Sequence, residues 1–202
     1  YPLAAPAYFV QQGNIEFVPY RAWPSPFTAE MWNVLGLLVG HDSLPQVFQW
    51  SMGLASAAAL YLLAAGRTSR RAAILAASIY YTTPHVLNLS TSAKSDLAWL
   101  MFLFLSLHSL LAWRERGNTG WLWLSAVSTG LALATKYHGL FWAPAIGLGL
   151  LVLQWPDWRK TPVRAVIRSS AYLGIAILVV SPWWIRNWLA SGDPIWPEGY
   201  AV

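Results

Sequence analysis

The chain has 202 residues, of which 56% are hydrophobic, 10% are charged and 14 are tryptophans. An ordinary soluble domain carries about 25% charged residues, so the composition excludes a typical soluble globular protein and places the chain in a membrane. The absence of cysteine excludes disulfides and thiolate metal sites, and the net charge of +5 comes without any basic stripe with interleaved aromatic residues that would suggest a nucleic-acid partner.

Residues 1–43 are predicted to form an outer loop rather than a membrane span. The segment begins at Tyr1 without a methionine or a basic-then-apolar signal peptide, so we expect a piece of a longer protein. Several prolines interrupt it, and only TAEMWNVLGLLVG, residues 28–40, is predicted to be a helix, with Thr28 as its cap. Because this helix is amphipathic, we expect it to lie in the membrane interface.

Apolar runs separated by charged residues or by Gly and Pro fill most of the remaining chain. They cover residues 44–65, 72–89, 97–113, 120–135, 139–155 and 170–185. Since a membrane-spanning helix needs about 20 residues, we predict an all-α membrane protein, a polytopic transmembrane helix bundle of about six spans. The bundle is predicted to occupy residues 44–188, and residues 189–202 to begin a second outer loop.

The number of spans depends on residues 121–155, which are almost uncharged. As a single helix this stretch would be roughly 50 Å long at about 1.5 Å per residue, much longer than the hydrocarbon core is thick. A break near Lys136, inside the stretch ALATKYHGLFWAP, is therefore expected.

The distribution of charge favours six spans. One face of the membrane then receives nine basic and two acidic residues, and the opposite face receives four basic and six acidic residues. The nine are Arg67, Arg70, Arg71, Arg114, Arg116, Arg159, Lys160, Arg164 and Arg168. The positive-inside rule makes their loops, including WRKTPVRAVIR, cytoplasmic. Lys136 and both ends of the chain are then expected outside.

Polar side chains collect on the outer face. Asp96 opens a helix, where it would either cap the free amides or serve a function. Lys136 would either snorkel from a helix end or bind a ligand, which is favoured because TKYHG offers a hydroxyl, a cation, a phenol and an imidazole at one turn. Arg186 is expected to be anchored among interfacial tryptophans.

Taken in order, these segments resemble the membrane glycosyltransferases of the GT-C class. The likeness is carried by an outer loop ending in P-x-x-x-E, by TP-H-V-L with a Ser/Thr-rich turn and an Asp that opens a helix, by G-L-A-L-A-T-K-Y-x-G-L, and by SPWWIRNWLASGDPIWP. It is similar to bacterial relatives of the protein O-mannosyltransferases, glycosyltransferase family 39, and of the aminoarabinose transferase that modifies lipid A. Such enzymes use an acidic general base to transfer a sugar, with inversion, from polyprenyl phosphate to an acceptor at the outer membrane face.

The resemblance implies roles for individual residues. Asp96 corresponds to a catalytic acid of the second outer loop, whereas the family's main catalytic aspartate would lie upstream of Tyr1, so we expect this chain to lack it, the first helix and the carboxy-terminal helices. Lys136 corresponds to the lysine near the donor phosphate, where a preorganised cation stabilises the charge of the leaving group. The residues that would bind the donor phosphate or the substrate are Lys136, His138, Tyr137, Lys94 and Arg21.

The partners implied are a polyprenyl-phosphate sugar donor, a lipid, glycan or protein acceptor, and the lipids of a bacterial inner membrane. No cofactor is implied with certainty, and a divalent metal is left open. One alternative is a transporter or flippase for a lipid-linked or anionic substrate, since polar hairpin tips also mark substrate paths, although the spans lack mid-membrane charges and an inverted repeat. A further alternative is a non-catalytic membrane subunit of a larger complex.

Overall fold

The computed structural model describes residues 3–17, 26–41 and 43–196, and within these ranges it contains ten helices and no strand. The amino-terminal helices are α1 (Ala4–Gln12) and α2 (Glu30–Leu38). The helices that follow are α3 (Leu44–Ala65), α4 (Arg70–Thr82), α5 (Pro84–Ser90), α6 (Asp96–Arg116), α7 (Thr119–Leu133), α8 (Gly139–Leu153), α9 (Trp155–Lys160) and α10 (Pro162–Ser191).

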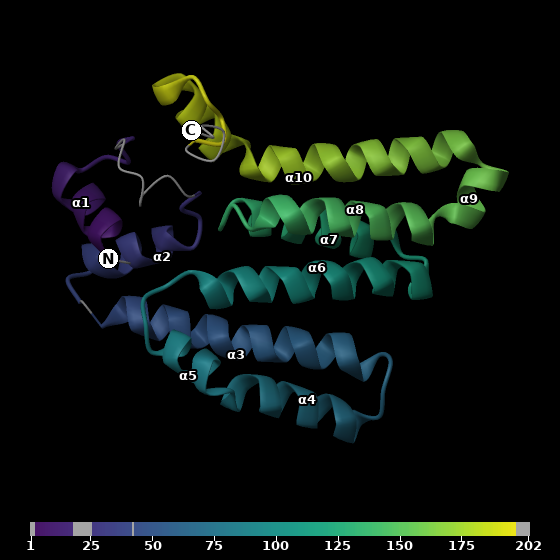
Figure 1. The fold of residues 1–202 in the computed structure, drawn as a ribbon, viewed down its shortest axis with the longest axis horizontal. Coiled ribbons are helices and arrows are strands. Elements are labelled where there is room, and N and C mark those ends of the chain that lie inside the picture. Colours follow the sequence, from purple (N-terminus) through teal and green to yellow (C-terminus); the bar gives the residue numbers. More distant parts are fainter. Residues whose placement is uncertain (1–2, 18–25, 42, 197–202) are drawn as a thin grey trace.

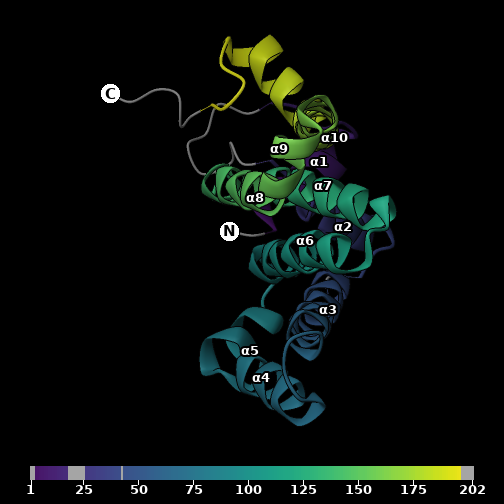
Figure 2. The same ribbon diagram turned by 90° about the vertical axis from the view of Figure 1, so that its right-hand side faces the viewer.

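The long helices lie side by side as antiparallel rods (Figure 1). The main packing pairs are α3 with α4, α3 with α6, α6 with α7, and α7 with α10, so α4 and α10 lie at opposite edges of the bundle (Figure 2). Helices α1 and α2 lie across one end, together with the turns 91–95, 134–138 and 192–196; we call this the site end. The opposite end carries the turns 66–69 and 117–118 and helix α9; we call it the basic end.

The prediction of an all-α membrane protein is confirmed. Among the described residues, α3, α6 and α10 are long and apolar enough to cross a membrane by length and composition, and α8 is a shorter apolar helix. Large apolar side chains such as Phe141, Leu178 and Leu189 are exposed on the sides of the bundle, as expected where lipid replaces water. The count of six spans and the interfacial placement of α2 stay predictions.

Two segments differ from the elements that the sequence predicts for them. The run 72–89 is divided into α4 and α5 at Thr83 and Pro84, because proline has no amide to donate and pushes the preceding residue out of the helical conformation. The basic segment WRKTPVRAVIR, predicted as a loop, is helical over most of its length, since Pro162 begins α10. Proline is well tolerated at the first position of a helix, where its missing amide would have no partner.

Helix α10 also continues through Pro182 to Ser191, beyond the predicted end at residue 185. Pro182 cannot donate to the carbonyl of Leu178, one turn earlier. The Ser181 hydroxyl donates to this Leu178 oxygen at 2.8 Å instead. A hydroxyl that satisfies a freed carbonyl is how membrane helices accommodate proline, so α10 delivers Arg186 and Asn187 to the site end without a break.

Two expectations for the amino-terminal segment are wrong. Helix α1 was not predicted, yet it forms because Pro6 lies in its first turn, where backbone amides lack intrahelical partners in any case. Thr28 does not cap α2: the residue preceding that helix is Ala29, and no side chain caps it. The Thr28 hydroxyl instead accepts a hydrogen bond from Trp183 Nε1 at 2.8 Å, which fastens the segment to α10.

The contact between α7 and α10 combines a close approach with buried hydroxyl groups. A Cβ atom on Gly130 would lie 2.7 Å from the backbone oxygen of Ala176, so the two helices can approach this closely only with glycine at that position. The Tyr172 hydroxyl lies 3.0 Å from Ser125 Oγ and 2.7 Å from Thr129 Oγ1. Ser125 Oγ also donates to the Ser106 carbonyl of α6 at 2.8 Å, so the buried hydroxyl groups of α7 find partners on both α6 and α10.

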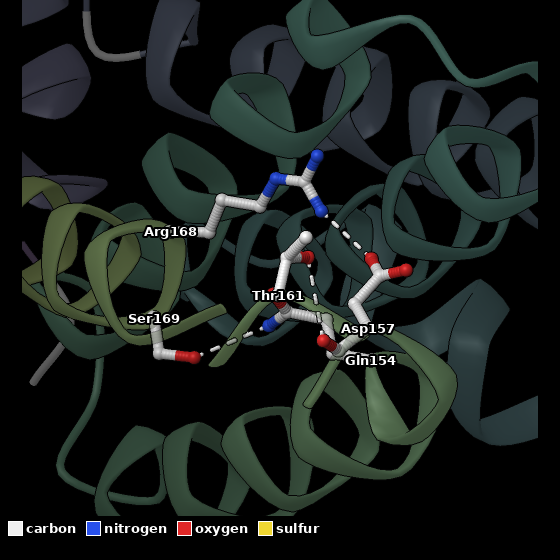
Figure 3. Close-up of polar contacts among 5 residues, drawn as sticks. All are labelled: Gln154, Asp157, Thr161, Arg168 and Ser169. Carbon is white, nitrogen blue, oxygen red and sulfur yellow. Dashed lines mark hydrogen bonds and ion pairs between the residues drawn. The ribbon is translucent and has the colours of Figure 1, made fainter. Parts of the chain in front are cut away.

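At the basic end, polar contacts hold the elbow between α8, α9 and α10 (Figure 3). Arg168 Nη1 is 2.8 Å from Asp157 Oδ2, and the Arg168 guanidinium lies over the ring of Trp113 at 5.7 Å. Gln154, which is fully buried, donates from Nε2 to Ser169 Oγ at 3.2 Å. The elbow therefore fixes the angle at which α10 runs back toward the site end.

A labelling experiment tests the predicted sidedness of the bundle. Cysteines introduced at the exposed positions Thr68, Asn118 and Thr161 of the basic end are expected to resist an impermeant thiol reagent in intact cells, because basic loops stay cytoplasmic. Cysteines at Thr91 and Ala190, which are exposed at the site end, are expected to react. Labelling at Thr161 together with protection at Thr91 would invert the topology.

Candidate functional site

An ion pair at the site end joins two residues that the sequence placed on the same face. Lys136 Nζ lies 2.6 Å from Asp96 Oδ1, and the two side chains are 25% and 33% exposed. Lys136 comes from the turn between α7 and α8, and Asp96 is the first residue of α6. The pair is therefore open enough to meet a ligand while being held by three helices.

Backbone hydrogen bonds and a glycine make the turn that carries Lys136 tight. The Lys136 amide donates to the Ala132 carbonyl, and the Gly139 amide donates to the Lys136 carbonyl at 2.9 Å. A Cβ atom on Gly139 would lie 2.7 Å from the Cα atom of Leu133. Since only glycine fits there, the sequence TKYHG folds back on the end of α7 and presents Lys136 in one direction.

Asp96 uses its carboxylate for this ion pair and not as a helix cap. The residue preceding α6 is Ser95, and no side-chain hydrogen bond caps the helix. The negative charge still lies in the first turn, where it meets the positive end of the helix dipole. The geometry therefore does not support the interpretation of Asp96 as a helix cap.

Glu30, which the sequence analysis did not assign to the site, lies between the two turns that hold the ion pair. The Thr28 amide donates to the Ala134 carbonyl at 3.1 Å, and Asn33 Nδ2 donates to the Ala93 carbonyl at 3.3 Å. These bonds fasten the start of α2 to the Lys136 turn on one side and to the Asp96 turn on the other. The only signal for Glu30 was its place at the end of P-x-x-x-E.

The carboxyl group of Glu30 is buried, and its Oε2 atom has no hydrogen-bond partner. Burial raises the pKa of Glu30 from 4.5 to about 7, against the opposing effects of a hydrogen bond from Ser95 and of the positive charge of Lys136, while the negative charge of Asp96 raises it further. Near neutral pH this group is therefore present both with and without its proton. Such perturbed carboxyl groups cluster at functional sites.

The predicted site residues Tyr137 and His138 differ in what they contact. The Tyr137 hydroxyl is buried, donates to the Trp196 carbonyl at 2.6 Å and accepts a hydrogen bond from Asn187 Nδ2 at 3.0 Å. His138 is exposed, and its ring meets the edge of Trp99 with centroids 5.8 Å apart. Tyr137 thus ties the Lys136 turn to the end of α10, whereas His138 is open to a ligand.

The remaining predicted cations are Lys94 and Arg21, and the structure describes the first of them. Lys94 is exposed on the turn before α6, where it lines a small hollow with Ala29 and Asn33. Arg21 lies outside the described residues. Among the residues that the structure describes, no group of three or more His, Cys, Asp or Glu side chains could hold a metal ion.

Arg186 is a further cation at the site end. Its guanidinium lies over the rings of Trp183, Phe27 and Phe17 at 5.0, 5.2 and 5.9 Å. It donates to Asn187 Oδ1, while its Nη1 atom is buried without a hydrogen-bond partner. The expected anchoring among aromatic rings is therefore observed, with two phenylalanines in addition to one tryptophan.

An apolar groove of about 400 Å³ begins near the Lys136 turn and runs between α7, α8 and α10. Near the turn it is lined by Leu140 and Trp184, and farther toward the basic end by Leu151 and Leu173. Nearly all of its walls are apolar, so it can hold a hydrocarbon chain.

Comparison with known proteins identifies the family. The sequence profile described as dolichyl-phosphate-mannose-protein mannosyltransferase matches residues 31–186, which include Asp96, Lys136 and Arg186. Comparison with the curated proteins and with the solved structures gives no match. Because the profile covers most of the chain, it supports the resemblance to the GT-C class and indicates a membrane glycosyltransferase. The chain therefore belongs to the dolichyl-phosphate-mannose-protein mannosyltransferase family.

Proposed function

We propose that this chain forms the donor-binding part of an inverting glycosyltransferase, which takes a sugar from a polyprenyl-phosphate carrier and transfers it to an acceptor at the outer face of a bacterial inner membrane. The observation that carries the proposal is the position of the Lys136 and Asp96 ion pair near the end of the apolar groove. A polyprenyl phosphate has the matching shape, with a long apolar tail and an anionic head.

Lys136 is the proposed ligand of the donor phosphate. At membrane depth the dielectric is lower than in water, so each contact between an ammonium and a phosphate oxygen is strengthened. During transfer the bond from the sugar to the phosphate oxygen breaks and the phosphate gains negative charge. A lysine already held by the tight turn stabilises that charge without having to be reoriented.

Asp96 is proposed to hold Lys136 in its orientation while the donor is absent. When the phosphate arrives, it replaces or shares the carboxylate as the partner of the ammonium group. His138, which is exposed on the same turn, is proposed to contact the sugar hydroxyls. Tyr137 is proposed to stabilise the Lys136 turn, because its hydroxyl joins the turn to the end of α10.

The function is tested by supplying purified intact protein in lipid nanodiscs with a polyprenyl-phosphate-linked sugar, and in a separate reaction with the corresponding nucleotide sugar. Transfer is expected only from the lipid-linked donor. A photo-crosslinking polyprenyl phosphate is expected to label residues that line the groove. Transfer from the nucleotide sugar, or movement of the lipid-linked sugar between leaflets without transfer, would contradict the proposal, and the second result would favour a flippase.

The role of the groove predicts a dependence on the length of the lipid. Gly147 lines the groove, and a Cβ atom there meets nothing within 4 Å, so Gly147→Leu is expected to fill the groove without disturbing α8. Binding of a long-chain polyprenyl phosphate should weaken on the order of tenfold, since several buried methylene groups lose their place. Binding of a short-chain analogue should change little.

Gly174→Leu is the matched control, because Gly174 lies on α10 with open space around it and does not line the groove. Both affinities should be unchanged in this variant. Equal effects of Gly147→Leu on long and short lipids would contradict the placement of the tail.

A further inference from the structure

We propose that Glu30 is a positioning residue that sets the charge around Lys136 and thereby controls how strongly an anionic phosphodiester is held there. The inference rests on the proposed function, since it concerns the same site. It adds a residue that acts through Lys136, and it predicts that binding of the donor is coupled to uptake of a proton.

The geometry places Glu30 close enough to both members of the ion pair for their charges to act on it. The start of α2 is fastened to the Lys136 turn through Thr28 and to the Asp96 turn through Asn33. The Ser95 side chain hydrogen-bonds the Glu30 carboxyl group, and the charges of Lys136 and Asp96 both act on it. Because Glu30 Oε2 is buried and has no hydrogen-bond partner, no contact of its own stabilises a negative charge on that atom.

The sum of charges in the cluster explains why the proton matters. With Glu30 protonated, Lys136 and Asp96 cancel, and an incoming phosphodiester with one negative charge meets a neutral site. With Glu30 ionised, the same anion meets a site with one net negative charge. At the separations within such a cluster, one additional like charge weakens binding by roughly tenfold or more.

Other titratable groups lie around the start of α2 and have to be distinguished from Glu30. Those on or near the elements that pack against it are Tyr8 of α1, Tyr61 at the far end of α3, Lys94, His138 and Arg186. Of these, His138 is exposed on the same turn as Lys136, so it requires a variant of its own.

The direction of the pH dependence follows from the pKa of Glu30, which burial raises to about 7. Below that pH the carboxyl group is protonated and the site is neutral, so binding is strong. As the pH rises through about 7 the proton is lost and binding weakens. Since the anion favours the protonated form, its arrival raises the pKa of Glu30 further, and the complex takes up a proton when it forms near neutral pH.

The probe is farnesyl methyl phosphate, a phosphodiester whose own charge stays constant over this range of pH. Its affinity for the intact protein in nanodiscs is measured from about pH 6 to about pH 8.5, together with the heat of binding in two buffers of different ionisation enthalpy, which reports proton uptake. The dissociation constant of the wild type is expected to rise roughly tenfold across this range, with proton uptake near neutral pH.

The variant Glu30→Gln keeps the shape of the side chain and is always neutral. It is expected to bind the probe as strongly as the wild type at about pH 6 and to stay strong at about pH 8.5, without proton uptake. Glu30→Asp should keep a pH dependence. The matched control is Glu16→Gln, an exposed carboxyl group outside the cluster that hydrogen-bonds Tyr8, and it should behave as the wild type.

The outcomes separate the two proposals. Strong binding of the probe without pH dependence in the wild type would overturn the role of Glu30 and leave the donor site in place. The same conclusion would follow if the pH dependence were lost in His138→Gln but kept in Glu30→Gln. Weak binding by Glu30→Gln at every pH would make Glu30 a structural residue. No binding of the probe by the wild type at any pH would overturn the donor site itself.

Discussion

Replacing Lys136 with methionine in the intact protein is expected to lower donor-dependent sugar transfer by about 10 to 150-fold. A charge-assisted contact with a phosphate is worth roughly 1.5 to 3 kcal/mol, and the loss is expressed in the rate when the transition state uses the contact more than the ground state does. Methionine keeps the apolar stem that passes along the turn, so folding and membrane insertion should be normal. The measurement is sugar transfer by purified protein, with crosslinking of a polyprenyl phosphate as the binding readout.

Two further variants make this result specific. Lys136→Arg is expected to keep part of the activity, because the charge survives while the planar guanidinium has a different geometry. Lys160→Met removes an exposed lysine at the basic end and should have no effect. Unchanged transfer and crosslinking in Lys136→Met would leave a lysine that only anchors the turn at the membrane surface.

Replacing Asp96 with asparagine is expected to reduce transfer at least about tenfold while leaving expression and thermal stability nearly unchanged. An ion pair whose side chains are 25% and 33% exposed is partly screened by solvent and contributes at most about 1 kcal/mol to stability. The interaction of Asp96 with the helix dipole, which asparagine loses, is worth only about 0.3 to 1 kcal/mol at the surface. A large loss of activity would therefore come from the missing negative charge next to Lys136 and not from unfolding.

A double variant shows whether Asp96 and Lys136 act together. If the carboxylate works by orienting Lys136, adding Asp96→Asn to Lys136→Met should cause little further loss, because residues that act as one unit are not additive. Full wild-type turnover in Asp96→Asn would instead make this residue structural. Losses that multiply in the double variant would give Asp96 a role that does not pass through Lys136.

The sequence predicted which segments are helical better than it predicted where each helix begins and ends. The run 44–65 is helix α3, because an uninterrupted apolar stretch of that length has one stable form in a membrane. Boundaries near proline depended on position within the helix: Pro84 divides a run, whereas Pro6 and Pro182 are accommodated. The pattern of residues does not say whether a nearby hydroxyl, such as that of Ser181, will take over the freed carbonyl.

The candidate site, like the helices, could be predicted from the sequence only in part. Sidedness alone placed Lys136 and Asp96 on one face, but their direct contact depends on how two turns pack, which no pattern in the chain states. Glu30 and Arg186 were not assigned to the site for a related reason. An acid at the start of a helix and an arginine among tryptophans have ordinary structural roles, and only the buried atoms without partners distinguish these two.

The Tyr172 hydroxyl joins two helices that are synthesised one well after the other. Ser125 and Thr129, its partners on α7, precede it by 47 and 43 residues, so α7 leaves the ribosome well before α10 exists. A helix of 15 residues with buried hydroxyl groups is short and polar for a bilayer. Because Tyr172 of α10 is the partner of Thr129, we expect α7 to reach its final packing only after α10 has been made, with Gly130 allowing the two backbones to approach closely.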